Sequence, residues 1–267
     1  MTDPRFAGID RLYGAGSVAR LAQAHVCVVG LGGVGSWAAE ALARSGVGEI
    51  TLIDADEVCL SNTNRQSHAI AGEIGRAKVD VVARRLQAIN PALALHALAE
   101  FVTAKNLEAL IGRDYGAVID ACDALRIKVD MIAFCRRRKL PIVVSGSAGG
   151  RADPALITAR DLSKTEHDVL LALVRKRLRD DYGWTRNPKR YFGVQAVFSR
   201  ENVNYQRPDG TMCKAPPPGG AEGALKLDCA GGLGAAMHVT ATFGMVAAAR
   251  AIERLLAAPL KPAGGTA

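Results

Sequence analysis

The chain has 267 residues, 49% hydrophobic and 22% charged, a composition that excludes a disordered or fibrous protein and allows one sizeable core. Its formal net charge of +8 is typical of a protein that meets a polyanion such as nucleic acid, although surplus surface cations also serve solubility alone. The six cysteines include no C-x-x-C pair, which excludes a disulfide framework and a zinc ribbon and favours a reduced, cytoplasmic protein. Residues 1–14 lack the basic and then apolar order of a signal peptide.

Strand and helix patterns alternate through the first half of the chain, after an N-terminal helical arm that we place at residues 1–24. Apolar runs predict strands at residues 25–29, 50–54, 117–122 and 140–146, and helical patterns lie at residues 37–44, 78–89 and 126–138. Because parallel strands need helical crossovers, this order predicts an α/β fold with a doubly wound, mostly parallel Rossmann-like sheet over residues 25–154.

The stretch VVGLGGVGS at residues 28–36 joins the first strand to its helix. Gly30, Gly32 and Gly35 fit the spacing G-x-G-x-x-G, which lets a backbone turn approach a phosphate at the start of a helix. The next strand ends in Asp54, an acid suited to a ribose hydroxyl. These features predict a nucleotide site, and they serve an NAD dehydrogenase and an ATP-dependent enzyme equally.

A polar cluster follows the second strand and decides between the two cofactors. Its members are Asp56, Asn62, Arg65, Gln66 and Lys78. An enzyme that splits ATP between the α and β phosphates needs cations and amide donors there, whereas a dehydrogenase has no such need. The cluster therefore favours ATP.

The second half changes character at residues 155–228, which we interpret as a basic α+β insertion. It contains an amphipathic helix at 167–182, a strand at 194–198 and a mobile Pro- and Gly-rich loop at 208–223. Residues 164–191 carry many cations, and Trp184 or Tyr191 could stack on a base of tRNA, although a solvated helix face is the alternative. The apolar run at 233–249 predicts a buried C-terminal helix, placed at 229–257, rather than a membrane span.

Four motifs, GLGGVGS, LIDADEVCLSNTNRQ, GRAKV and IDACDALRIK, resemble the E1-like adenylating superfamily of ThiF, MoeB and the ubiquitin-activating proteins in order and spacing across residues 20–150. The resemblance implies one E1-like domain over the whole chain, a homodimer, and ATP with Mg²⁺ as cofactors. It also implies site residues, with Gly33 at the phosphate turn and Asp54 on the ribose; the phosphate contacts and the magnesium ligand would be Asn62, Arg65, Lys78 and Asp123.

One further site residue rests on the same resemblance, and at one position the chain departs from the family. Arg11, in RLYG, is similar to the family's N-terminal arginine, which reaches into the ATP site of the partner subunit. Where the family has Asp-Asn after the fourth strand, this chain has Asp123-Ala124, so any role of that Asn is missing.

The segments RLYG, NTNRQ, CRRRKLPIV, GVQAVFS and DCAGGLGAA resemble one branch of the superfamily, the tRNA threonylcarbamoyladenosine dehydratases, over about residues 5–256. This resemblance implies ATP-dependent cyclising dehydration of t6A at position 37 of tRNA to cyclic t6A, through an acyl-adenylate, with release of AMP and pyrophosphate. Arg65, Lys78 and Asp123 would then stabilise the charge that develops on the phosphates.

Cys229 lies beside Asp228 and a glycine run, and its role stays open. It could be a reactive thiolate at the start of a helix that accepts an acyl group, or a small buried thiol that packs a turn. The resemblance also suggests that Asp228 and Cys229 shape a backbone carbonyl site for Na⁺ or K⁺.

Three alternative functions remain. Adenylation of the C-terminus of a ubiquitin-like sulfur carrier is the nearest, and the missing zinc-binding cysteine pairs and the basic insertion argue against it. NTNRQ and Lys78 disfavour a nicotinamide oxidoreductase. The third alternative is a noncatalytic tRNA-binding scaffold for a cysteine desulfurase system, which would not turn over ATP. A partnership with such a system is also compatible with an enzyme.

Overall fold

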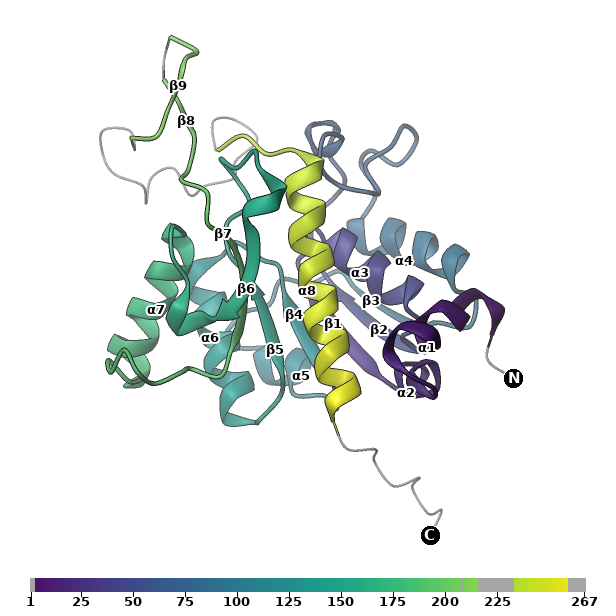
Figure 1. Cartoon of the computed structure of the whole chain (residues 1–267). Helices are drawn as coiled ribbons and strands as arrows, with labels where there is room; N and C mark the ends of the chain where they lie inside the picture. The colour runs from purple at the N-terminus through teal and green to yellow at the C-terminus, as the bar shows by residue number, and fades with distance from the viewer. Residues whose placement is uncertain (1–2, 208, 216–232, 259–267) are drawn as a thin grey trace.

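A seven-stranded sheet forms the centre of the computed structural model, which describes residues 3–207, 209–215 and 233–258 (Figure 1). The strands lie in the order β3-β2-β1-β4-β5-β7-β6, and every neighbouring pair is parallel except β6 and β7. Their bounds are β1 (His25–Val29), β2 (Glu49–Ile53), β3 (Ala94–Leu98), β4 (Ala117–Asp120), β5 (Ile142–Ser145), β6 (Ile157–Asp161) and β7 (Gln195–Ser199). The predicted doubly wound, mostly parallel α/β fold is confirmed.

Helices cover both faces of this sheet. One face packs against α2 (Ser17–Ala22), α3 (Gly35–Arg44), α4 (Lys78–Ile89) and α8 (Met237–Ala257), and the other against α5 (Leu107–Ile111), α6 (Leu125–Arg137) and α7 (Val169–Tyr182). The helix α1 (Ala7–Tyr13) lies on α2. Because successive side chains of each central strand enter opposite layers, these strands read as continuous apolar runs in the sequence.

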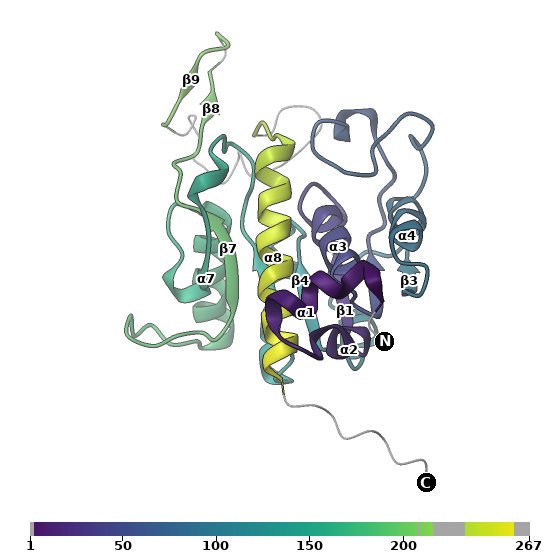
Figure 2. The ribbon, with the colours of Figure 1, turned by 45° about the vertical axis from the view of Figure 1, so that its right-hand side comes forward.

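The C-terminal helix begins later than predicted. It starts at Met237 rather than at residue 229, and residues 233–236 before it are not helical. Residues 229–232 lie outside the described part of the chain. Figure 2 shows α8 beside α3, and the close approach needs Gly244, where an added Cβ would lie 2.5 Å from the carbonyl oxygen of Val34. Among the described residues, no helix combines the length and apolarity needed to cross a membrane.

The basic region is continuous with the nucleotide-binding sheet. Its strands β6 and β7 extend the edge of that sheet, and α7 packs on α6. Part of the predicted loop is regular, since β8 (Tyr205–Gln206) and β9 (Met212–Cys213) pair as an antiparallel hairpin. Residues 208 and 216–223 of that loop lie outside the described residues.

Candidate active site

A cavity of about 540 Å³ opens at the carboxyl ends of the central strands. Its lining includes every residue predicted to bind nucleotide except Gly35: Gly30, Gly32, Gly33, Asp54, Asp56, Asn62, Arg65, Gln66, Lys78 and Asp123. The carboxyl edge of an open parallel sheet is where ligands bind in doubly wound folds. The topology thus brings together groups that are far apart in the sequence.

The glycine turn is shaped by close backbone approach. Gly30 has φ of +84°, and a Cβ there would lie 3.0 Å from the backbone of Ala121. At Gly35, which is buried, a Cβ would lie 1.8 Å from the carbonyl oxygen of Gly30. Gly35 therefore permits the start of α3 to pack on the turn, which explains why it supports the cavity without lining it.

Asp54 holds this turn against the end of β2. Its Oδ2 accepts a hydrogen bond from the Leu31 amide at 2.6 Å, and its Oδ1 accepts one from the Asp56 amide at 2.8 Å. A carboxylate has about four lone-pair sites, so these two bonds leave acceptor capacity for a hydroxyl group. Asp54 can organise the turn and bind a ribose at the same time.

Lys78 enters the cavity at the first residue of α4. Its side chain is only 8% exposed, and its Nζ lies 2.8 Å from Oδ2 of Asp56. The backbone repeats this link, because the Lys78 amide donates to the Asp56 carbonyl at 2.9 Å. The ammonium is thus held by a carboxylate that a phosphate could replace as its partner.

Arg65 follows the short 3-10 helix Leu60–Asn62. Its guanidinium donates to the Ser61 carbonyl at 2.8 Å and to Asn64 Oδ1 at 2.9 Å, while its own carbonyl accepts from Trp37 Nε1 at 3.0 Å. The Trp37 bond fixes the backbone of Arg65 on α3, and the two side-chain bonds use only one nitrogen of the guanidinium of this cavity-lining residue.

Asp123 lies between β4 and α6, exposed on the cavity wall. Beneath it Lys128 Nζ lies 2.8 Å from Asp120 Oδ2, and both side chains are fully buried. Burial opposes the charge of Lys128, but the Asp120 carboxylate outweighs it and holds the pKa of Lys128 above its ordinary value. This pair was not predicted from the sequence, although both residues belong to IDACDALRIK.

A second missed element is the loop at residues 145–149, which lines the cavity after β5. The buried Asp168 carboxylate accepts from the Ser147 amide at 2.9 Å and caps α7 through the Leu171 amide at 2.8 Å. Gly146 allows this contact, because a Cβ there would lie 2.1 Å from Asp168 Oδ2. Burial raises the pKa of Asp168. The signal in the sequence was the glycine-rich SGSAGG directly after a strand.

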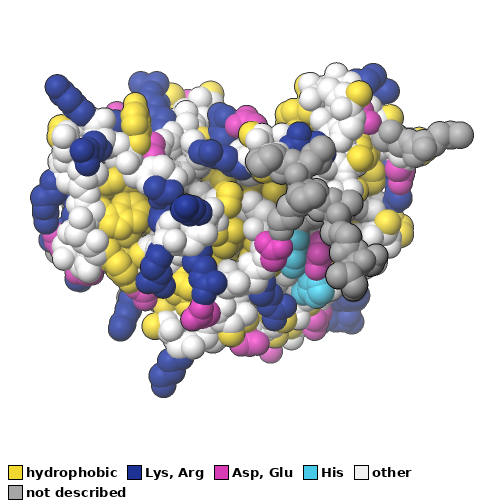
Figure 3. All heavy atoms as spheres, turned by 90° about the horizontal axis from the view of Figure 1, so that it is seen from below, with side chains coloured by type: hydrophobic (Ala, Val, Ile, Leu, Met, Phe, Trp, Pro, Cys, Tyr) yellow, Lys and Arg dark blue, Asp and Glu magenta, His cyan; other side chains and the backbone are white. Residues whose placement is uncertain are grey.

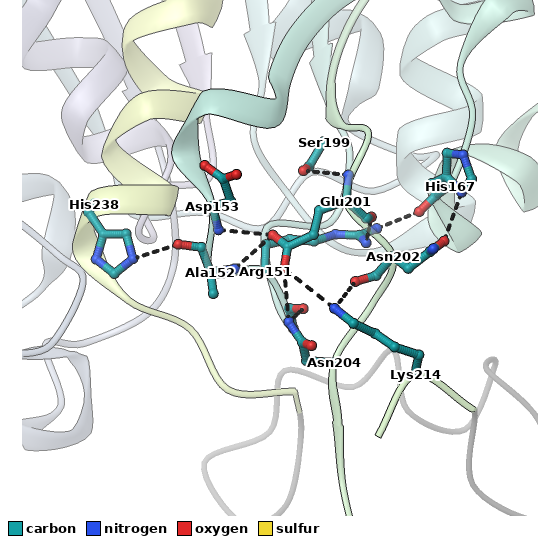
Figure 4. Close-up of polar contacts among 11 residues, drawn as sticks. Arg151, Ala152, Asp153, His167, Ser199, Glu201, Asn202, Asn204, Lys214 and His238 are labelled. Carbon is teal, nitrogen blue, oxygen red and sulfur yellow. Dashed lines mark hydrogen bonds and ion pairs between the residues drawn. The ribbon is translucent and has the colours of Figure 1, made fainter. Parts of the chain in front are cut away.

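A polar network anchors the chain just beyond that loop (Figure 4). Glu201 accepts from the Ala152 amide at 2.9 Å and the Asp153 amide at 3.0 Å, and the buried Arg151 donates to the carbonyls of Glu201 and His167. From α8, His238 Nε2 lies 3.1 Å from the Ala152 carbonyl oxygen. The network ties the wall of the cavity to α8 and to the segment that leads into the β8–β9 hairpin.

Some predicted residues lie elsewhere. Arg11 is exposed on α1 and does not line the cavity. Asp228 and Cys229 lie outside the described residues, so the structure says nothing about the thiol or the cation site.

The basic region and α6 together form a second hollow, of about 420 Å³, at the carboxyl-terminal ends of α6 and α7. It is lined by Ala133, Arg136, Arg137, Tyr182, Trp184, Thr185, Tyr191 and Phe192. Trp184 packs edge-on against Phe192, with 4.9 Å between ring centroids, whereas Tyr191 is 68% exposed beside the Lys164 ammonium. Figure 3 views this end of the molecule, where Lys and Arg side chains surround apolar surface.

Comparisons with known proteins show the family of the chain. A model of the ThiF family matches residues 7–264. The tRNA threonylcarbamoyladenosine dehydratase of Escherichia coli is 49% identical over 253 residues, which cover 95% of this chain and 94% of that protein. Solved structures of the E. coli dehydratase superpose with a TM-score of 0.83 in complex with ATP (44% identity, 96% and 97% covered) and 0.82 in complex with AMP (46%, 95% and 94%). The chain belongs to the ThiF family and, within it, to the tRNA threonylcarbamoyladenosine dehydratases.

Proposed function

We propose that this protein uses ATP to dehydrate t6A at position 37 of tRNA to cyclic t6A, with release of AMP and pyrophosphate. The observation that carries the proposal is the convergence of the glycine turn, Arg65, Lys78 and Asp123 on one cavity. The ATP and AMP complexes of the E. coli relative support a nucleotide there.

The cavity suggests how ATP lies. The glycine turn at the start of α3 would bind phosphates, and Asp54 would bind the ribose. Phe101 and Val102 line the cavity after β3, the neighbour of β2, which Asp54 directly follows, and they would supply an apolar wall for the adenine ring. Gln66 and Asn62 complete the polar side of the cavity.

The reaction runs in two steps. An oxygen of the threonyl carboxylate attacks the α-phosphorus, the bond to the β-phosphate breaks, and pyrophosphate leaves. The carbamoyl nitrogen or oxygen of the same side chain then attacks the acyl carbon, an N–H proton of the carbamoyl group is lost, and AMP leaves with the original carboxylate oxygen. Arg65 and Lys78 stabilise the phosphate charge, and tethering of nucleophile and ester replaces a covalent enzyme intermediate.

Asp123 is the residue that we assign to Mg²⁺. Its exposed carboxylate shares the cavity with the proposed phosphate site, while Asp56 is paired with Lys78. One carboxylate together with phosphates is a donor set that suits Mg²⁺. When bound, the ion would neutralise charge on the phosphates. A Na⁺ or K⁺ site at Asp228 and Cys229 stays a prediction.

We also propose a homodimer in which Arg11 completes the ATP site of the partner subunit. Arg11 is exposed on α1 in the single protomer. A side chain that reaches into the site of another subunit has to be exposed before the two subunits meet. Mixing Arg11→Ala chains with Lys78→Ala chains tests this, because mixed dimers contain one site with neither defect. Recovery of activity supports the proposal, and no recovery in a preparation that has exchanged subunits contradicts it.

The basic hollow is the surface that we assign to tRNA. The helix α6 begins beside Asp123 and ends at Arg137, so the hollow lies one helix length, roughly 20 Å, from the cavity. A folded tRNA can reach both places at once. Arg136 and Arg137 would meet phosphates, and the exposed Tyr191 could stack on a base.

AMP release tests the function directly. We compare tRNA carrying t6A, the same tRNA without t6A, and a ubiquitin-like sulfur carrier, and we expect AMP only with the first. Arg65→Ala and Asp123→Ala should each lower the rate by about 10²–10³-fold. Arg84→Ala is the matched control, since its guanidinium is exposed and pairs with Glu73 at 2.7 Å. AMP release with the sulfur carrier alone would replace the proposed substrate.

A further inference from the structure

Two histidines and a glutamate gather at the amino-terminal edge of the sheet, the edge opposite the cavity. His25 begins β1, Glu49 begins β2, and His96 is the third residue of β3. Figure 3 looks onto this end, where histidine side chains lie beside acidic ones. The proposed dehydration uses none of these residues.

Strand register places the three side chains on one face. His25 pairs with Glu49, and Thr51 pairs with His96, in two parallel ladders. Residues i and i+2 of a strand point to the same side, so Glu49 and Thr51 share a face, and so do their partners. The alignment is therefore a property of the sheet and not of one rotamer.

The potential ligand atoms are close enough for one ion. His25 Nδ1 lies 3.4 Å and His96 Nε2 lies 2.7 Å from Oε1 of Glu49, and all three atoms lie within 4.8 Å of one another. Zinc bonds of about 2.0–2.2 Å in a tetrahedron separate neighbouring ligand atoms by roughly 3.3 Å. His25 and Glu49 already have this spacing, and His96, whose side chain is 42% exposed, can open to it.

Thr51 orients the more buried of the two imidazoles. Thr51 is fully buried, and its Oγ1 lies 2.8 Å from His25 Nε2. When Nε2–H donates to this hydroxyl, Nδ1 carries the lone pair and points to Glu49. A metal-bound histidine commonly has such a partner on its second nitrogen. Tyr115 holds the same ring edge-on, with 4.6 Å between centroids, and burial lowers the pKa of His25, which favours the neutral ligand.

We propose that His25 Nδ1, His96 Nε2 and the Glu49 carboxylate bind one Zn²⁺ or a similar divalent first-row transition metal. Two imidazoles exclude Mg²⁺ and Ca²⁺, which take oxygen ligands. The ion joins β1, β2 and β3, the three strands at one edge of the sheet, so its role is to stabilise that edge. The proposal is independent of the dehydratase function.

The test uses the full chain without a histidine tag, freed of metal with a chelator and titrated with Zn²⁺ by calorimetry. We expect one Zn²⁺ per chain and a higher melting temperature with Zn²⁺. Affinity should fall at least ~100-fold in Glu49→Gln and His96→Gln, and about 10–100-fold in Thr51→Val, which removes only the orienting hydroxyl. The control is His167→Gln, since His167 is exposed and bonds to Asn202 at 2.9 Å elsewhere.

Co²⁺ provides a second measurement on the same variants. A tetrahedral complex gives strong visible absorption, which we expect in the wild type and in His167→Gln but not in His96→Gln. Uptake of less than one Zn²⁺ per chain, equal affinity in wild type and His96→Gln, or weak octahedral Co²⁺ absorption would overturn the proposal. AMP release on t6A-containing tRNA is recorded alongside and should be equal in wild type and His96→Gln without added Zn²⁺.

Discussion

At the carboxyl ends of β1, β2 and β4, the groups that face the cavity come from the loops that follow the strands, whereas at the amino ends of β1, β2 and β3 the histidine and glutamate side chains come from the strands themselves. Loop residues follow one another in the sequence, so their motif can be read there. Strand residues meet only through pairing, which the sequence does not display. A site built from loop residues can therefore be recognised in the sequence, whereas a site built across paired strands cannot.

The largest effect should come from the buried ion pair under the cavity. Lys128→Met leaves the Asp120 carboxylate buried without its cation, which should lower the free energy of unfolding by about 3–5 kcal/mol, measured by urea denaturation. Lys176→Met, at an exposed position of α7, should change it little. Adding Asp120→Asn to Lys128→Met should recover part of the loss. A loss below ~1 kcal/mol in Lys128→Met would show that the pair does not support this end of the sheet.

The second prediction separates the reaction in the cavity from tRNA binding in the basic hollow, through their different effects on kcat and KM. Lys78→Ala should lower kcat for AMP release by about 10²–10³-fold, because it removes a cation of the cavity that we propose binds the phosphates. Arg136→Ala, in the basic hollow, should raise KM for tRNA and leave kcat near the wild-type value. Steady-state kinetics with t6A-containing tRNA measures both. A fall of kcat in Arg136→Ala would mean that the hollow takes part in catalysis and would remove the contrast.

His68 makes the stability of the folded protein depend on pH. Burial first, and then Lys78 and Arg85, lower its pKa in the folded protein to about 4, against an ordinary value of 6.5. Between these values the unfolded chain binds the extra proton, so stability falls as pH decreases from 6.5 to 4. The contribution is roughly 3 kcal/mol, from 1.36 kcal/mol per pKa unit.

Urea unfolding at several pH values checks this. His68→Leu should have a flatter dependence than the wild type between pH 6.5 and 4, while His238→Leu, at an exposed position, should keep the wild-type slope. Parallel curves for wild type and His68→Leu would contradict the account of His68.

The smallest effect concerns the basic hollow alone. Arg137→Ala should weaken tRNA binding about equally with and without t6A, and should reduce the slope of log affinity against log salt by about 1, as expected for one lost phosphate contact. Filter binding at several salt concentrations measures the slope. Arg44→Ala is the control, because Arg44 lies on α3, on the other face of the sheet. An equal reduction of the salt slope in Arg44→Ala would mean that net charge, and not a contact in the hollow, sets the slope.

The sequence predicted the central part of the fold well. The strands β1, β2, β4 and β5 and the helices α3, α4 and α6 have strong periodic patterns, and α4 has the predicted bounds, whereas the short α5 was not predicted. The strands β3 and β6 were missed because they lie at the edges of the sheet and are half-exposed, so neither has a buried apolar run. The start of α8 was wrong because the small residues before Met237 read as helix, whereas residues 233–235 are not helical and Ala236 has an extended backbone.

The residues of the candidate site also fall into those that the sequence predicted and those that it did not. Arg65, Lys78 and Asp123 were found because their motifs have a fixed order along the chain, and all three line the cavity. The role of Asp168 depends on a contact with the loop after β5, 21 residues earlier in the chain. Asp120 and Lys128 lie in one motif, but their ion pair forms only when α6 packs against the end of β4. The metal cluster could not be predicted, because it requires the register of β3, a strand that the sequence analysis did not find.

The most direct test of the central claim follows the nucleoside itself. The purified protein is incubated with ATP, Mg²⁺ and tRNA that carries t6A, the RNA is digested, and the nucleosides are weighed by mass spectrometry while AMP is counted. The account predicts that t6A loses the mass of one water, with one AMP for each molecule changed, and that Asp123→Ala loses both signals together. Unchanged t6A beside bound or hydrolysed ATP would contradict it.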